Sequence, residues 1–221
     1  MLQASDLHKI YSLGKEKIHA LKGITFSFKK GTMTAFVGPS GSGKSTLLHL
    51  LAGIDQPTKG EIHLNGQILS HLNETERTRI RLFQIGFVFQ RFFLLPYLTA
   101  EENIELPLLE AGIKRIERVK RTKELLSLFG VENRADHRPW QISGGEKQRI
   151  AIARALANNP PIILADEPTG ELDEANTKQI GKILKNLAKD GKLVVLATHN
   201  HELAQQADHL ISLRDGKIEK Q

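Results

Sequence analysis

The chain has 221 residues, a formal net charge of +6 and no cysteine. Its length is sufficient for one large domain with a buried core, and the lack of cysteine excludes disulfide bonds and thiolate metal sites. The positive charge fits a solvated basic surface, a nearby acidic membrane, an anionic ligand or nucleic acid, and it does not choose among them.

No segment of the sequence is predicted to cross a membrane. The N-terminal segment Met1–Lys9 carries charges and lacks an apolar centre, so we do not expect a secretory signal there. The most apolar stretch, Ile85–Ala100, is interrupted by polar residues and a proline and is too short to span a bilayer. We therefore expect the chain to act on a membrane only by docking to a partner that enters it.

Strand-like and helical patterns alternate in the N-terminal part of the chain, which favours an α/β fold with a mostly parallel sheet. The predicted strands are Ile18–Leu21, Ile24–Phe26, Thr32–Val37, Glu61–Leu64 and Ile85–Phe89, and the predicted helix is Gly43–Ala52. Asn65-Gly66 predicts a turn after the fourth of these strands.

The sequence then becomes mostly helical over Thr99–Ala157. Thr99 and Glu102 form a Thr-x-x-Glu pattern, which is typical of a capping box at a helix start. Lys114–Phe129 is charged and amphipathic, and the following Gly130 can end a helix there.

Apolar runs return after Pro160-Pro161. Ile162–Ala165 and Leu193–Leu196 are predicted to be buried parallel strands with a helix between them, and Asp215-Gly216 predicts a C-terminal hairpin. The outline is a single domain, 1–221, with an α/β core at 1–90 and 158–221 and a helical subdomain at 91–157.

The segment Gly38–Ser45 matches the phosphate-loop pattern G-x-x-x-x-G-K-[ST] at every fixed position. Glycines let the backbone wrap so that its N–H groups point at phosphate oxygens, and the helix that follows adds the positive end of its dipole. Lys44 can then reach the β- and γ-phosphates, and Ser45 can bind Mg²⁺. A flexible Gly-Ser loop is the alternative, but it does not explain why the segment follows a predicted strand and opens a predicted helix. The predicted nucleotide-binding residues of this segment are Gly38, Pro39, Ser40, Gly41, Ser42, Gly43, Lys44, Ser45 and Thr46.

Two carboxylates, Asp166 and Glu167, follow the apolar run Ile162–Ala165. In phosphate-loop proteins an Asp at such a strand end holds the Mg²⁺ site. A Glu one residue later faces another direction, from which it can polarise a water against the γ-phosphate. An acidic loop boundary without function is the alternative, and the phosphate loop in the same chain argues against it.

The segment Ile142–Arg149 resembles the signature sequence of ABC ATPases, which separates that family from other phosphate-loop proteins. The resemblance covers the whole chain. It implies a phosphate-loop core with a mostly parallel sheet, an N-terminal antiparallel β part and an inserted α-helical subdomain. By position in the family pattern, the implied roles are adenine stacking for Tyr11, sensing of Mg²⁺ and the transmembrane partner for Gln90, crossing of the dimer interface for Asp173, and contact with the γ-phosphate for His199. The alternatives to these roles are that Tyr11 is a core or surface aromatic, Gln90 a solvated strand end, and His199 a helix residue with no ligand.

The resemblance also implies a reaction, the hydrolysis of ATP to ADP and phosphate, with ATP and Mg²⁺ bound. Positioning and electrostatics supply most of the rate of such a reaction. The predicted catalytic residues are Lys44, which neutralises charge, Glu167, which orients the water, and His199, which holds the γ-phosphate. The predicted Mg²⁺ ligands are Ser45, Gln90 and Asp166.

Ser143 and Glu146 form a second capping-box pattern, which predicts a helix from Gly144 onward. A helix N-terminus binds anions, and in ABC ATPases this one meets the ATP of the other subunit, so the resemblance implies a homodimer with two composite sites. Many family members have Gln in place of Glu146. Because a carboxylate aimed at a phosphate would be repelled, we expect Glu146 to cap its own helix and not to touch ATP. Asn200 follows His199 at a position where the family often has an acidic residue. We expect this difference to change a helix cap without loss of catalysis. The predicted signature residues are Ser143, Gly144, Gly145 and Glu146.

Within the family, the chain is most similar to the group that serves lipoprotein release, macrolide and antimicrobial-peptide efflux, and cell-division signalling. The segments that carry this similarity are Tyr11, Lys15–Lys17, His19–Gly23, Phe92–Pro96, Glu101–Ile104 and Ala165–Gly170. The resemblance implies a motor subunit on the cytoplasmic face of a membrane that drives a separate permease. A soluble ABC ATPase acting on nucleic acid or ribosomes is the alternative. The single phosphate loop, and the lack of a long heptad insertion between Gln90 and Ser143, argue against it.

The segment Arg91–Tyr97 is unusually apolar for a loop. It belongs either to the core of the helical subdomain or to a groove for a cytoplasmic helix of the permease. We hypothesise that Phe92 and Phe93 contribute to such a groove.

Overall fold

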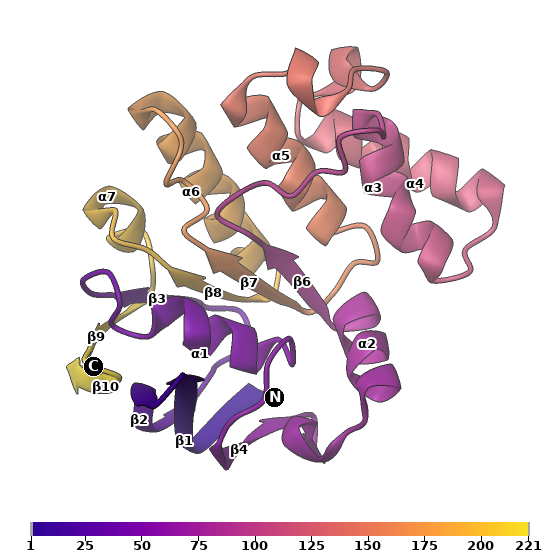
Figure 1. The fold of residues 1–221 in the computed structure, drawn as a ribbon. Helices are drawn as coiled ribbons and strands as arrows, with labels where there is room; N and C mark the ends of the chain where they lie inside the picture. Colours follow the sequence, from indigo (N-terminus) through magenta and orange to yellow (C-terminus); the bar gives the residue numbers. More distant parts are fainter. Residues whose placement is uncertain (1, 221) are drawn as a thin grey trace.

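The computed structural model describes residues 2–220; Met1 and Gln221, the ends of the predicted domain, lie outside the described residues. The strands form two sheets (Figure 1). The first is antiparallel, and its strands are β1 (Leu2–Leu13), β2 (Glu16–Ser27), β4 (Lys59–Leu64) and β5 (Gln67–Ile68), in the order β2-β1-β4-β5.

The second sheet has six strands in the order β10-β9-β3-β8-β7-β6. Their bounds are Met33–Val37 for β3, Ile85–Val88 for β6, Ile162–Asp166 for β7, Leu193–Ala197 for β8, His209–Arg214 for β9 and Lys217–Lys220 for β10. All neighbours in this sheet are parallel except β10, which pairs with β9 in the predicted C-terminal hairpin. The predicted α/β class, with a mostly parallel sheet and an N-terminal antiparallel part, is therefore confirmed.

The central strands β7 and β8 are buried on both faces, as is typical of parallel strands covered by helices. Because successive side chains of a strand point to opposite faces, Ile162 and Leu164 join one buried cluster, whereas Ile163 and Ala165 join another. Each face of the sheet therefore needs its own cover.

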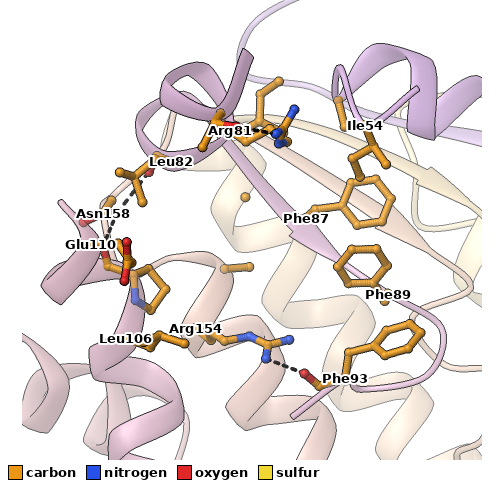
Figure 2. Close-up of a pocket in the computed structure, with 16 residues that line it drawn as sticks. Ile54, Arg81, Leu82, Phe87, Phe89, Phe93, Leu106, Glu110, Arg154 and Asn158 are labelled. Atoms are coloured by element: carbon orange, nitrogen blue, oxygen red, sulfur yellow. Dashed lines mark hydrogen bonds between the residues drawn. The ribbon is translucent and has the colours of Figure 1, made fainter. Parts of the chain in front are cut away.

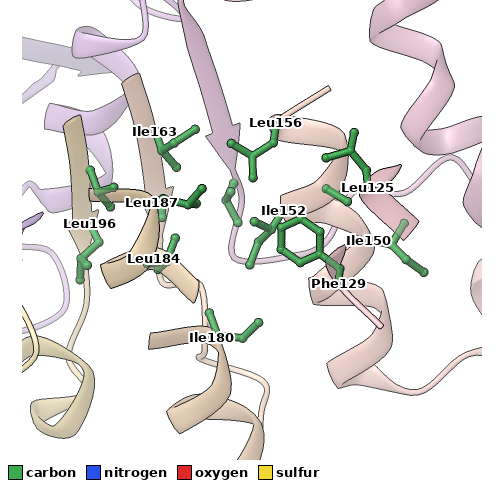
Figure 3. Close-up of a cluster of buried hydrophobic side chains, with 14 of the residues drawn as sticks. Leu125, Phe129, Ile150, Ile152, Leu156, Ile163, Ile180, Leu184, Leu187 and Leu196 are labelled. Atoms are coloured by element: carbon green, nitrogen blue, oxygen red, sulfur yellow. The ribbon is translucent and has the colours of Figure 1, made fainter. Parts of the chain in front are cut away.

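One face is covered by α1 (Lys44–Leu51) together with the antiparallel sheet, and the other by α5 (Gly144–Ala155) and α6 (Glu174–Lys189) (Figure 1). Side chains of α3 (Ala100–Glu110) and α4 (Arg115–Leu128) extend the second cluster. Figure 3 shows how side chains of the helical segment, the sheet and α6 meet in this cluster. Of the helices between residues 100 and 155, α5 contacts β6 of the parallel sheet, and α3 and α4 pack against α5.

Local side-chain signals set several helix ends where the sequence predicts them. The Thr99 hydroxyl accepts a hydrogen bond from the backbone of Glu102, whose carboxylate accepts one from the Thr99 backbone, so the capping box is confirmed. Gly130, with a φ of 61°, follows the end of α4 as predicted. The Asn200 side chain caps the short helix α7 (His201–Ala204).

Other elements were not predicted. The helix α2 (Glu74–Phe83) begins at Asn73, which forms a capping box with Glu76, and the strand β1 pairs with both β2 and β4. Residues 2–220 also contain three short 3-10 helices, η1 (Leu69–His71), η2 (Glu132–Arg134) and η3 (Pro139–Gln141).

The apolar stretch Ile85–Ala100 is divided between β6, a loop and the first residue of α3. Over residues 2–220, no helix has both the length and the apolar character that a bilayer crossing requires.

The loop before α3 is held by a buried amide. Asn103 is fully buried. Its Oδ1 accepts a hydrogen bond from the Leu95 backbone N–H at 2.7 Å, and its Nδ2 lies within hydrogen-bonding distance of the carbonyls of Leu95, Leu98 and Thr99. Since buried backbone groups without partners are costly, this side chain fixes the end of the loop that connects β6 to α3.

Asn103→Ala is expected to lower the free energy of unfolding by about 2–4 kcal/mol, because several buried backbone groups lose their partner at once. Urea unfolding of the two proteins measures the difference. The exposed Asn133 provides a control, and its replacement by Ala should change stability by less than about 0.5 kcal/mol. Equal losses of unfolding free energy in the two variants would show that the Asn103 side chain does not hold the loop.

Candidate nucleotide site

The phosphate loop connects β3 to α1, and two of its glycines, Gly38 and Gly43, leave no room for a side chain. A Cβ at Gly38 would overlap the carbonyl oxygen of Leu213 in β9, and a Cβ at Gly43 would collide with the carbonyl oxygen of Ala20 in β2. Both glycines also have positive φ, 151° and 102°, a region that other residues rarely occupy. The neighbouring strands therefore fix the shape of the loop.

Lys44 is buried and folded back over this loop. Its Nζ donates hydrogen bonds to the carbonyls of Gly38 at 2.9 Å and Pro39 at 3.1 Å. The hydroxyl of Ser42 is buried and has no hydrogen-bond partner within residues 2–220. A cation wrapped by the loop, an unpartnered hydroxyl and the N-terminus of α1 together fit an anionic ligand such as a phosphate chain.

The structure brings Ser45 next to Asp166 at the end of β7. The Ser45 hydroxyl donates to Asp166 Oδ1 at 2.9 Å. Burial, assisted by the neighbouring charge of Glu167, raises the pKa of Asp166, although the bond from Ser45 opposes the shift. A cation beside this carboxylate would offset the cost of its charge. The hydroxyl and carboxylate oxygens are of the type that Mg²⁺ takes in phosphate-loop sites, so the residues present fit that ion.

Glu167 is buried at the same edge of the sheet and has a φ of 46°, which is costly for a residue other than glycine. Its backbone N–H donates to the carbonyl of Ala197 at 2.9 Å. Its Oε2 accepts from the His199 backbone N–H at 3.2 Å and lies 3.0 Å from His199 Nδ1. The amide of Gln90 lies against Gly170, in the turn after Glu167. The predicted Glu, His and Gln are therefore gathered around one point.

Tyr11 lies near Thr46 of α1 and is held by two residues that the sequence did not single out. Its hydroxyl donates to Asp55 Oδ2 at 2.8 Å, while Asp55 Oδ1 accepts from Lys9 Nζ at 2.6 Å. Burial and the Asp55 carboxylate raise the pKa of Tyr11, so its hydroxyl remains a neutral donor. Tyr11 is 38% exposed, and these contacts fix the orientation of its side chain.

The signature lies elsewhere in the chain. Ser143 and Glu146 form the predicted capping box at the start of α5. A Cβ at Gly145 would overlap the side chain of Asn176 in α6, and Asp173 caps α6 by accepting from the Asn176 backbone at 2.8 Å. The helices α5 and α1 pack on opposite faces of the sheet, and a Cβ at Gly144 of the signature would meet Leu172, Glu171 and Phe92 rather than residues of the phosphate loop.

A groove lies between β6, α2, α3 and α5 (Figure 2). The rings of Phe87, Phe89 and Phe93 follow one another along it, with centroids 4.4 and 5.1 Å apart. Arg154 is largely buried, which lowers its pKa, and it donates to the carbonyls of Phe92 at 2.9 Å and Phe93 at 2.6 Å. Phe93 is 61% exposed. The interpretation of Arg91–Tyr97 as subdomain core is therefore wrong for the exposed part of that segment.

Comparisons with known proteins identify the family of the chain. A family model described as ABC transporter matches residues 21–170. An uncharacterised ABC transporter ATP-binding protein of Thermotoga maritima is 48% identical over 219 residues, which are 99% of this chain and 94% of that protein. The macrolide export ATP-binding/permease protein MacB of Escherichia coli O157:H7 is 44% identical over 218 residues, which are 99% of this chain and 34% of MacB.

The solved structures include a dimeric, post-hydrolysis state of the ATP-binding cassette MJ0796 of Methanocaldococcus jannaschii, bound to ADP and Pi. It matches with a TM-score of 0.94 and 45% identity, and covers 100% of this chain and 97% of that one. Fold and site together define a phosphate-loop ATPase that binds ATP. The chain belongs to the ABC transporter family, as an ATP-binding subunit of the group that includes MacB.

Lys44→Ala is expected to weaken ATP binding by about 10- to 100-fold, because charge-assisted hydrogen bonds to the phosphates are lost. Titration calorimetry measures the affinity, and phosphate release measures the fall in turnover. Lys30→Ala, at an exposed position before β3, is the matched control and should resemble the parent protein. Parental affinity and turnover in Lys44→Ala would contradict the assigned role.

Proposed function

We propose that the protein is the ATP-driven motor of a separate membrane permease and that it works as a dimer of two copies. The observation that carries the proposal is the position of the signature, which lies across the sheet from the phosphate loop of its own chain. In a twofold dimer the signature of each copy would face the nucleotide site of the other copy, and two composite sites would form. The dimeric state of the MJ0796 cassette with ADP and Pi supports this arrangement.

In the proposed site, Lys44 leaves the loop carbonyls and donates to phosphate oxygens. Mg²⁺, when bound, would neutralise charge on the phosphates, with Ser45, Asp166 and Gln90 as its candidate protein ligands. The fixed and partly exposed ring of Tyr11 would stack on the adenine, since its hydroxyl is already engaged by Asp55.

Glu167 is the proposed base that orients the attacking water. The Oε2 of Glu167 is within hydrogen-bonding distance of His199. A water that binds this carboxylate would therefore compete with His199 for the oxygen. The His199 side chain is 67% exposed and can turn to the γ-phosphate. Contact with the γ-phosphate would thus free Glu167 at the moment when the water needs it.

Glu167→Gln is expected to keep ATP binding, to lose hydrolysis by about 10²- to 10⁴-fold, and to accumulate as an ATP-bound dimer. Size-exclusion chromatography with ATP and Mg²⁺ detects the dimer, and phosphate release measures the rate. Glu124→Gln, on the surface of α4, should behave as the parent does. Hydrolysis at the parental rate in Glu167→Gln would show that another group is the base.

The groove beside β6 is the proposed docking site for a cytoplasmic helix of the permease, which would place the protein on the cytoplasmic face of a membrane. Its aromatic lining is open to solvent at Phe93, and an apolar groove of this kind is suited to the apolar face of a helix. The name of MacB joins an ATP-binding part to a permease, and the match covers only 34% of its length. This supports a membrane permease as the partner, with export or force transmission as the output.

Phe93→Asp is expected to abolish capture of the permease, because a carboxylate would replace an apolar contact in the groove. Tagged protein is recovered with ATP and Mg²⁺ from detergent-solubilised native membranes, and the proteins that accompany it are identified. Tyr97→Asp is the control, since Tyr97 is 84% exposed and does not line the groove. Urea unfolding must show that both variants are folded. Recovery of ribosomes or nucleic acid in place of a membrane protein would contradict the proposed partner.

A further inference from the structure

The signature contains a carboxylate whose two oxygens are both engaged. Glu146 Oε2 accepts hydrogen bonds from the Ser143 backbone N–H at 2.9 Å and from the Ser143 hydroxyl at 2.8 Å. Glu146 Oε1 accepts from Arg134 Nε at 2.8 Å. The Arg134 guanidinium, with the bonds from Ser143, lowers the pKa of Glu146 to about 2. The carboxylate is therefore ionised at neutral pH, and it faces a serine hydroxyl on one side and a guanidinium on the other.

Arg134 reaches Glu146 from η2, twelve residues earlier in the chain. Its side chain is 35% exposed and that of Glu146 is 17% exposed. Within residues 2–220, Glu146 is the only carboxylate that Arg134 pairs with. Because partly exposed ion pairs contribute little to folding stability, the position of this pair in the signature calls for another explanation.

The explanation rests on the proposed dimer. There, the Ser143 hydroxyl and the N-terminus of α5 meet the γ-phosphate of the ATP held by the other copy. The hydroxyl must then turn from Glu146 to the phosphate, which leaves an ionised carboxylate close to a highly charged anion. Like charges brought together in an interface are costly, so a carboxylate at this position needs a cation that stays with it after Ser143 has turned away.

We propose that Arg134 is a positioning residue of the composite ATP site. It neutralises Glu146 and holds the carboxylate back, so that Ser143 can donate to the γ-phosphate of the partner copy without repulsion. Because Arg134 binds Oε1 and Ser143 binds Oε2, the ion pair survives when the hydroxyl leaves.

The test compares ATP-dependent dimerisation in the Glu167→Gln background by sedimentation, at several protein concentrations and with Mg²⁺. Adding Arg134→Ala should raise the dimer dissociation constant at least tenfold, since each dimer contains two such sites. Arg134→Lys, which keeps the charge, should restore most of the loss. Adding Glu146→Gln to Arg134→Ala should also restore dimerisation, because no carboxylate then remains to be neutralised.

A second ion pair supplies the matched control. Arg118 Nε donates to Glu105 Oε1 at 2.7 Å, and this pair lies on α3 and α4, outside the signature. Arg118→Ala should leave dimerisation at the level of the Glu167→Gln parent. The affinity of the monomer for a fluorescent ATP analogue should not change in Arg134→Ala, since the phosphate loop is untouched, and urea unfolding reports whether each variant is folded.

Unimpaired dimerisation of Arg134→Ala would overturn the proposal. So would an equal loss in Arg134→Ala with and without Glu146→Gln, because Arg134 would then act through something other than the carboxylate. Failure of the Glu167→Gln parent to dimerise with ATP would refute the proposed dimer itself, and this inference with it.

Discussion

The hydrogen bond from Ser45 to Asp166 joins two residues that are 121 positions apart. It forms because β3 and β7 are both parallel to β8, which lies between them. Strands that run in one direction end at one edge of the sheet, so the phosphate loop after β3, the carboxylates at the end of β7 and His199 after β8 meet there. The nucleotide site is thus a consequence of strand order, and the helices and the antiparallel sheet serve to cover the strands that create it.

Sequence patterns predicted the parts of the structure that depend on near neighbours. The capping boxes at Thr99 and Ser143 were predicted because their partners lie three residues away, and the strands β7 and β8 because continuous apolar runs need burial. The strand β1 was missed because its apolar residues do not alternate regularly with polar ones, and its pairing with β2 shifts register several times. For α2, Asn73 and Glu76 have the spacing of a capping box, which is a local signal for a helix start.

The site residues also divide into those that a local motif predicts and those that depend on distant contacts. Phosphate loop and carboxylates are contiguous motifs, and the fold brings them together. The hydrogen bond that holds Tyr11 was not predictable, because Asp55 is 44 residues away and meets Tyr11 only after β1 packs beside the segment that follows α1. Nor does spacing reveal Arg134, whose bond to Glu146 depends on how η2 lies against the start of α5. Supporting residues of this kind are distant in sequence and carry no motif of their own.

A chain of contacts joins the nucleotide site to the groove. The loop after β6 places Gln90 against the turn after Glu167 and, three residues later, places Phe93 in the groove. Arg154 of α5 binds the carbonyls of Phe92 and Phe93, and the same helix begins with the signature. A displacement of α5 by ATP in a second copy would therefore be transmitted to the loop through hydrogen bonds to a largely buried guanidinium, and not through a flexible linker. Since Asn103 fixes the far end of this loop, such a displacement would act on the segment between Gln90 and Phe93. Phe93 is the residue of that segment that lines the groove proposed for a permease helix.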